Sequence, residues 1–194
     1  MQISLLEVSG AVLALAFILL ASRRSVWAWP PYIASSLLYL PVFLREHLYL
    51  DSLLQLYFVG MGVYGWRSWA EASDGVVPIS WTLQQHARWV ALWLAVTLVS
   101  GTLLAFTPAG GFGFADAFIA LGSIIATVIT VRRVLENWWY WLAINLTSVV
   151  VYGMKGLWVS AGLFCIYAVL SVRGLIAWSK VARSKVARSQ ALKS

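Results

Sequence analysis

A succession of apolar segments constrains this chain more than any other feature. A hydrocarbon core about 30 Å thick takes roughly 20 helical residues to cross, and only helices or closed barrels satisfy their backbone hydrogen bonds there. Seven segments of about this length, separated by short polar, glycine or proline stretches, cover residues 5–21, 26–44, 52–69, 89–106, 113–131, 138–154 and 157–177. The sequence therefore predicts an all-α integral membrane protein with seven transmembrane helices.

Composition argues against a soluble enzyme and against a nucleic-acid partner. Apolar and aromatic residues make up 61% of the 194 residues and charged residues 11%, whereas soluble domains are about 25% charged. The net charge of +7 comes from basic residues in short loops and at the end of the chain, as is typical of the cytoplasmic side of a membrane protein. The single cysteine, Cys165, allows neither an intrachain disulfide nor a cysteine metal cluster. We expect no metal, no cofactor and no nucleic acid.

The distribution of basic residues over alternate loops predicts the orientation. With the N-terminus outside, the residues on the inner side are Arg23, Arg24, Arg67, Arg88, Arg132, Arg133, Lys180, Arg183, Lys185, Arg188 and Lys193. Only Arg45 and Lys155 fall on the outer side. This excess predicts an outer N-terminus and an inner C-terminus.

An internal repeat relates the two ends of the chain. The sequence can be aligned with itself, without a gap, at one constant offset, which we call the repeat spacing. This alignment superposes Arg23-Arg24 on Arg132-Arg133, Trp29 on Trp138, Leu54 on Leu163, Gly65 on Gly174 and Trp69 on Trp178. The first three segments then match the last three, and one segment separates them, so both units enter the membrane from the same side. Parallel 3+1+3 repeats of this kind occur in the SWEET sugar carriers, which bind substrate near mid-membrane between the units.

This repeat predicts the organisation of the chain. The expected parts are a first three-helix unit over 1–70, a linker over 71–112 with a connecting transmembrane helix (89–106) and a turn at 107–111, a second three-helix unit over 113–178, and a basic cytoplasmic tail over 179–194. The tail contains Ser-Lys-Val-Ala-Arg twice. Two interpretations of the tail stay open: it binds anionic lipid headgroups, at about 1 kcal/mol per basic residue, or it is a solvated, poorly ordered end that sets topology.

The segment 138–154 carries the most informative side chains. At 100° per residue, an arc of about 80° holds Trp138, Trp141, Asn145, Ser148 and Tyr152. Indole faces alternating with an amide and a hydroxyl suit a flat polar ligand, because ring stacking contributes about 0.5–1.5 kcal/mol per contact and more for a cationic ring. The alternative is an interfacial aromatic belt, including Trp139 and Tyr140, with an interhelical hydrogen bond from Asn145.

Two further polar residues are candidates for ligand contact. Gln55, in the third segment, either bonds a neighbouring helix or contacts the ligand. Asp116, near the outer end of the fifth segment, is either a gate or ligand contact or a wetted carboxylate at a helix start. Both histidines, His47 and His86, fall in predicted loops, and no carboxylate pair has helical spacing within a segment. An enzyme is therefore not expected.

One string of residues is specific enough to suggest a family. It is Glu136-Asn137-Trp138, followed by Trp141 and Asn145. It is accompanied by Arg23-Arg24, Trp29-Pro30, the stretch Asp-Ser-Leu-Leu-Gln-Leu-Tyr at 51–57, Tyr64-Gly65-Trp66 and Asp116. In these motifs, over nearly the whole membrane region, the chain resembles the PnuC family of bacterial vitamin transporters.

The resemblance implies a seven-span SWEET-like fold that assembles as a homotrimer in the lipid of the bacterial inner membrane. Family members carry nicotinamide riboside inward by facilitated diffusion, while a cytoplasmic kinase, with no direct contact expected, traps the product; others carry thiamine or riboflavin. The resemblance assigns substrate contacts to Trp138, Trp141 and Asn145, and less directly to Gln55 and Asp116.

The chemistry of the residues agrees with such a ligand. Nicotinamide riboside is a cationic pyridinium with an amide and a ribose, and thiamine is also a flat cation. A phosphate ester needs a basic pocket, and no Lys or Arg lies at mid-membrane. No proton-relay carboxylate or Na⁺ site is evident there either, so we expect uniport of the dephosphorylated vitamin by alternating access. The alternative of a different class is a structural or assembly subunit whose aromatic stripes pack against partner helices.

Overall fold

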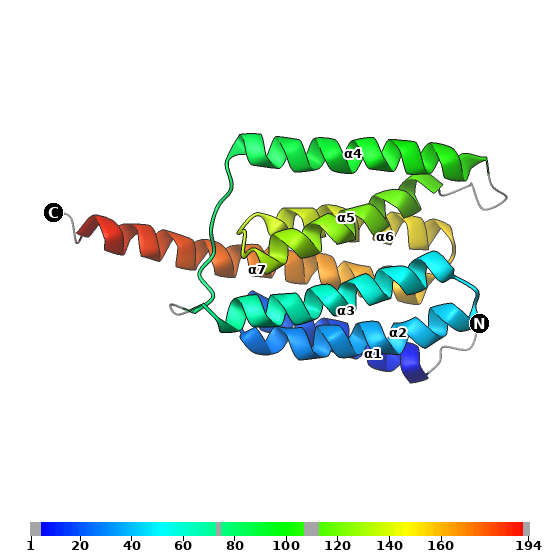
Figure 1. Ribbon diagram of the computed structural model, residues 1–194, viewed down its shortest axis with the longest axis horizontal. Helices are drawn as coiled ribbons and strands as arrows, with labels where there is room; N and C mark the ends of the chain where they lie inside the picture. The colour runs from blue at the N-terminus through cyan, green and yellow to red at the C-terminus, as the bar shows by residue number, and fades with distance from the viewer. Residues whose placement is uncertain (1–4, 73–74, 107–112, 192–194) are drawn as a thin grey trace. The chain divides into compact units, whose positions relative to one another are not determined.

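The computed structural model describes residues 5–72, 75–106 and 113–191, which form seven α-helices (Figure 1). They are α1 Leu5–Ser22, α2 Trp29–Arg45, α3 Tyr49–Ala70, α4 Leu83–Ala105, α5 Gly113–Val131, α6 Asn137–Met154 and α7 Trp158–Ala191, with a short 3₁₀ helix, η1 Val26–Ala28, before α2. The turn expected at 107–111 lies outside the described residues. The all-α prediction is confirmed, and α5 has the predicted bounds.

Among the residues that the structure describes, three helices are long and apolar enough to cross a membrane by length and composition alone: α1, α5 and the part Trp158–Lys185 of α7. The others are shorter or more polar. α2 has 17 residues, and α6 includes Asn145, Thr147 and Ser148. Polar side chains occur in membrane helices where they face protein and hydrogen-bond across helices, so the composition of α6 is typical of a helix with one face turned toward protein.

α4 begins at Leu83 rather than at residue 89, because a capping box precedes it. Thr82 N donates to Gln85 Oε1 at 2.8 Å, and Gln85 N donates to Thr82 Oγ1 at 3.3 Å. His86 consequently lies in the first turn of α4, and its prediction as a loop residue is wrong. Because the first turn of α4 is polar, its hydropathy is low, and the start of the helix cannot be predicted from hydropathy.

α7 continues without a break from Trp158 to Ala191, a length of 34 residues. At 1.5 Å per residue it is about 51 Å long, well beyond a hydrocarbon core of about 30 Å. Residues 179–191 are rich in Ala, Lys and Arg and contain no Gly or Pro, a composition that favours helix. The basic tail therefore begins as a continuation of α7, and the interpretation as a poorly ordered end is wrong for these residues.

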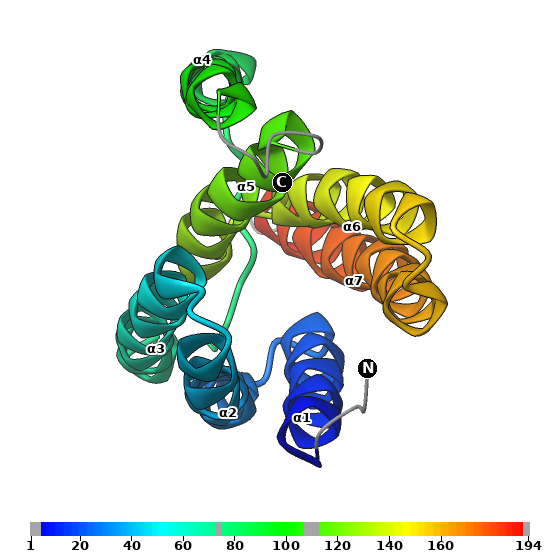
Figure 2. The same ribbon diagram turned by 90° about the vertical axis from the view of Figure 1, so that its right-hand side faces the viewer.

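The chain divides into two compact units. Unit 1 contains residues 1–78, 131–133 and 176–194, and unit 2 contains 79–130 and 134–175. Within unit 1, α1, α2 and α3 lie side by side (Figure 2). Ser35 Oγ of α2 donates to Gly10 O of α1 at 2.8 Å, so α1 and α2 are joined at a buried position.

Trp93 of α4 belongs to the hydrophobic core of unit 2, together with residues of α5 and α6. Trp93 stacks on Phe118 with ring centroids 4.2 Å apart and donates from Nε1 to Phe118 O at 2.9 Å. On α6, Tyr140 is buried, and its ring stacks on Trp93 at 6.0 Å. Tyr140 is therefore a core residue, and its interpretation as part of an interfacial belt is wrong. The reason is that α4 covers the side of α6 from which Tyr140 projects.

Left-handed backbone conformations recur at the repeat spacing. Arg24 and Arg133 both have φ 60°, and His47 and Gly156 have φ 58° and 72°. Each pair follows the end of a helix, where a left-handed residue commonly ends the helix. The spacing found in the sequence is thus also present in the backbone at two kinds of turn.

Two tryptophan–glycine contacts recur at the same spacing. The Trp29 ring of α2 lies against Gly65 of α3, where an added Cβ would be 2.4 Å from the ring. The Trp138 ring of α6 lies against Gly174 of α7 in the same way, with a corresponding distance of 2.5 Å. Both contacts need a residue without Cβ, because the indole occupies its space.

A second pair of tryptophans links helix ends within unit 1. Trp69 Nε1 donates to Val131 O, and Trp178 Nε1 donates to Ala21 O, both at 3.0 Å. The two indole rings are 6.0 Å apart. The equivalent residues of the repeat therefore make nearly equivalent hydrogen bonds, each to the last turn of α5 or α1.

The tryptophan–glycine contacts lead to a stability prediction. We expect Gly174→Ala to lower the free energy of unfolding by about 1–3 kcal/mol, because the new methyl group displaces the Trp138 ring. Thermal unfolding of the detergent-purified protein measures this. Gly162→Ala in the same helix is the control, since no described atom lies within 4 Å of its Cβ position. Equal melting temperatures for the two variants would contradict the close contact.

Candidate functional site

The side chains predicted to share one face of α6 are turned toward the protein in the structure. Trp138 and Asn145 are 3% and 5% exposed, and Ser148 is fully buried. Trp141 and Tyr152, on the same arc, are half-buried. Trp139, on the opposite side of α6, is 56% exposed. The helix therefore separates its aromatic residues into a protein-facing set and an outward-facing one.

Trp138 is almost fully buried in this face and is held by packing. Its ring covers Gly174 of α7, as Trp29 covers Gly65 in the equivalent place. The indole thereby forms a wall where α6 meets α7, and its position depends on the absence of a side chain at residue 174.

Trp141 is oriented by a polar network at the junction of α5 and α6. Its Nε1 donates to Thr130 Oγ1 at 3.0 Å, and this hydroxyl lies 2.8 Å from Ala126 O and 3.2 Å from Asn137 Oδ1. Asn137 Nδ2 donates to Val134 O at 2.6 Å. Because the edge of the indole is bonded at Nε1, the orientation of the ring plane is restricted, while stacking uses the ring faces.

Asn145 makes the interhelical hydrogen bond that the sequence leaves open. Its Nδ2 donates to Ser171 Oγ of α7 at 3.2 Å, and Ser171 Oγ donates to Tyr167 O at 2.9 Å. Over the described ranges of the chain, Ser171 is the one group seen to hydrogen-bond this amide. A side-chain amide has two donor hydrogens and an acceptor oxygen, so the bond to Ser171 uses only part of its capacity.

Tyr152 and Asp116 are engaged at the far end of α6. Tyr152 stacks on Phe164 of α7, with centroids 5.1 Å apart and ring planes 10° from parallel. Asp116 pairs with Lys155, whose Nζ lies 3.1 and 3.3 Å from its two carboxylate oxygens, and its side chain is 49% exposed. Lys155 follows Asn145 by about three helical turns, roughly 15 Å along a helix. The structure thus places Asp116 with the α6–α7 turn and not beside Asn145.

Gln55 belongs to α3 of unit 1 and is half-buried. The other five candidate residues belong to unit 2: Trp138, Trp141, Asn145, Asp116 and Tyr152. In the repeat, position 55 corresponds to Phe164, the ring on which Tyr152 stacks. Positions 55 and 164, which are related by the repeat spacing, therefore differ in chemistry: one is a polar amide and the other an aromatic ring.

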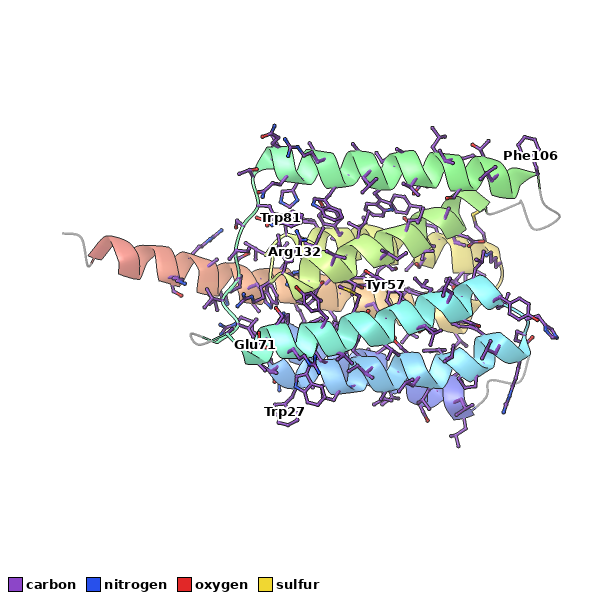
Figure 3. The ribbon with its side chains drawn as sticks, in the orientation of Figure 1. Trp27, Tyr57, Glu71, Trp81, Phe106 and Arg132 are labelled. Atoms are coloured by element: carbon purple, nitrogen blue, oxygen red, sulfur yellow. The ribbon has the colours of Figure 1, made fainter. Side chains whose placement is uncertain are left out.

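Glu136 joins α6 to α4 and makes no side-chain capping bond to its own helix. Its Oε2 accepts from Trp81 N at 3.3 Å and lies 3.6 Å from His86 Nε2. His86 Nδ1 is 3.0 Å from Tyr140 Oη. Trp81 lies next to the start of α4 (Figure 3). Sequence reasoning missed this cluster, although the Thr82-x-x-Gln85 box is a signal that places His86 on a helix.

The family can now be stated from comparison with known proteins. The model of the family described as nicotinamide mononucleotide transporter matches residues 4–180, and so includes all the site residues described above. The chain belongs to this family. It is a family of membrane transporters and not of enzymes, so membership supports the prediction that the chain is not an enzyme and argues against a structural subunit.

Relatives of the family match over most of their length. The nicotinamide riboside transporter PnuC of Escherichia coli strain K12 is 25% identical over 225 aligned positions, covering 97% of this chain and 90% of the relative. The riboflavin/roseoflavin transporter RibM of Streptomyces davaonensis is 28% identical over 178 positions, covering 89% and 83%.

A solved structure shares the fold. The crystal structure of the vitamin B3 transporter PnuC superposes with a TM-score of 0.74 at 20% identity, covering 92% of this chain and 82% of that one. With the family match and the E. coli relative, it confirms the resemblance to PnuC that the motif at 136–145 predicts.

Proposed function

We propose that this family member carries nicotinamide riboside into the cell across the bacterial inner membrane. The observation that carries the proposal is the α6 face, where the indole of Trp141, oriented by Thr130, lies one helical turn from the Asn145 amide. A cationic pyridinium stacks on the indole, and the amide bonds a polar substituent. The name of the E. coli relative supports the riboside, and that of RibM supports the wider class of flat vitamins. Thiamine is the alternative substrate.

The other candidate residues of the site have supporting roles in this proposal. Trp138, whose ring covers Gly174, and Tyr152, whose ring stacks on Phe164, are further candidate contacts on the same face as Trp141. Gln55 is the candidate contact from unit 1, and Asp116 acts at the outer end of the path through its pair with Lys155.

We infer that the transporter works by alternating access between two parallel three-helix repeats, 1–70 and 113–178, joined by the connecting helix α4. The recurrence of turns and tryptophan contacts at the repeat spacing supports the repeats. The basic loops support an outer N-terminus and an inner C-terminus with the tail 179–194 in the cytoplasm. A homotrimer in the membrane lipid, and a cytoplasmic kinase that traps the product, follow from the resemblance to PnuC.

The experiment that tests the function is uptake into proteoliposomes free of phosphatase. We expect saturable uptake of labelled nicotinamide riboside and only background uptake of nicotinamide mononucleotide, because α6 carries no Lys or Arg to neutralise a phosphate. Imposed proton or Na⁺ gradients should leave the rate unchanged, because α6 carries no carboxylate either. Mononucleotide uptake at the riboside rate would contradict the choice of substrate, and a gradient-dependent rate would contradict uniport.

A further inference from the structure

We propose that Ser171 is a positioning residue that orients the Asn145 amide, so that the site presents one acceptor and one donor to a primary carboxamide of the substrate. The proposal deepens the proposed function and rests on it, since Asn145 must contact the riboside. It assigns to α7 a part in choosing between vitamins with a carboxamide and those with a carboxylate.

The hydrogen of Ser171 determines which side of the amide faces it. Ser171 Oγ lies 2.9 Å from Tyr167 O, and a carbonyl oxygen only accepts, so the hydroxyl hydrogen points to Tyr167. The lone pairs of Ser171 Oγ then face Asn145 at 3.2 Å and require a donor. Nδ2 is that donor, which turns Oδ1 away from Ser171.

The opposite amide orientation satisfies fewer groups. With Oδ1 toward Ser171, the single hydroxyl hydrogen would have to serve both Oδ1 and Tyr167 O, and one acceptor would lose it. Tyr167 O lies inside α7 and keeps its helical backbone bond in either case, so the opposite orientation has one hydrogen bond fewer. Because Ser171 and Asn145 are 2% and 5% exposed, water does not replace the lost bond, and the orientation with Nδ2 toward Ser171 is favoured. Burial therefore fixes the orientation of the Asn145 amide, with Nδ2 toward Ser171.

The Asn145–Ser171 pair belongs to one half of the repeat only. The equivalent positions in the first half are Ser36 and Gly62. Ser36 Oγ donates to Tyr32 O of its own helix at 3.2 Å, and Gly62 packs against the Ile33 side chain. The first half therefore packs the equivalent helices without this hydrogen bond. Packing of the equivalent helices does not require the pair, which supports a role for it in substrate recognition.

The free capacity of Asn145 defines the chemistry of its partner. Beyond the bond to Ser171, the amide has Oδ1 and one Nδ2 hydrogen. A primary carboxamide offers the matching donor and acceptor, whereas a carboxylate offers acceptors alone and opposes Oδ1. Nicotinamide riboside carries the carboxamide, and nicotinic acid riboside carries a carboxylate on an otherwise identical frame. The wild-type protein should therefore prefer the first.

Calorimetric titration of both ribosides into purified wild type and Ser171→Ala tests the orientation. We expect Ser171→Ala to weaken nicotinamide riboside binding about tenfold while leaving nicotinic acid riboside no weaker, since the released amide turns either side to the ligand. Ser171→Thr keeps the hydroxyl and should restore both the affinity and the preference. Ser123→Ala, which removes a hydroxyl that donates to Ile119 O of its own helix, is the matched control and should match wild type.

The other outcomes contradict either the orientation of the amide or the proposed function. Parallel weakening of both ribosides in Ser171→Ala would show a structural role and overturn the orientation, as would wild-type behaviour of the variant. Melting temperatures of all variants, measured on the same samples, separate misfolding from altered recognition. Failure of wild type to bind either riboside would instead overturn the proposed function, and with it this inference.

Discussion

Trp141→Ala is expected to lose nicotinamide riboside binding by roughly 30-fold or more. The variant removes the ring face on which the pyridinium stacks, together with the apolar area that the ligand buries, for a combined loss of about 2–4 kcal/mol. It also removes the donor to Thr130 Oγ1. Trp141→Phe keeps an aromatic face but not the Nε1 donor, and an intermediate affinity is expected because the ring is less restricted. Calorimetric titration of the purified variants measures both.

Trp139→Ala is the matched control for this experiment. Trp139 lies close to Trp141 in the sequence but projects from the outward side of α6, where it is 56% exposed. The same truncation there should leave riboside affinity within about twofold of wild type. Equal losses in Trp139→Ala and Trp141→Ala would show that the α6 face does not bind the ligand.

Asn145→Ala should separate ligand recognition from stability. Removing the amide leaves the substrate carboxamide without its buried partner, at a cost of about 1–3 kcal/mol, so affinity should fall roughly 5- to 150-fold. The interhelical bond to Ser171 is lost as well, but such bonds contribute only about 0.6 kcal/mol in membranes. The melting temperature should therefore change little. Titration and thermal unfolding of the same sample measure the two effects.

Thr147→Ala provides the comparison for Asn145→Ala. Thr147, close to Asn145 in the sequence, donates from Oγ1 to Ala143 O of its own helix at 2.9 Å. Removing this hydroxyl should leave affinity and stability close to wild type. A large stability loss in Asn145→Ala without a specific affinity loss would indicate that the amide serves packing alone.

The helices were predictable where apolar residues dominate from end to end. α5 is apolar over almost its whole length, and its bounds agree with the hydropathy. α4 was predictable only in its apolar part, because its first turn is polar and depends on the Thr82–Gln85 capping box. The full length of α7 was not predictable from hydropathy. Its basic residues mark the end of the apolar span, but they also favour helix, so the helix continues through them.

The face of the candidate site was predictable, but its supporting contacts were not. The 100° spacing correctly places Trp138, Asn145 and Ser148 on the protein-facing side of α6. Hydrogen-bond partners on other helices, such as Ser171 on α7, have no fixed spacing from their acceptors or donors. Their choice depends on how helices pack, which hydropathy does not encode. Tyr140 was misassigned for the same reason, because only the packing of α4 buries it.

The clusters at the two ends of α6 illustrate the same limit. Asp116 and Lys155 belong to different helix ends, and each alone is typical of a wetted helix end. Glu136 and His86 are far apart in the sequence and meet only because α4 starts early enough to carry His86. Charge pairs of this kind become visible only when the helix ends are placed in space.

Calorimetric titration of the purified wild-type protein with nicotinamide riboside, followed by thiamine, tests the central claim most directly. The account predicts a saturable heat with the riboside that Trp141→Ala abolishes and Trp139→Ala retains. Binding of thiamine alone would keep the site and change the vitamin. A folded protein that gives no heat with either vitamin would contradict the account.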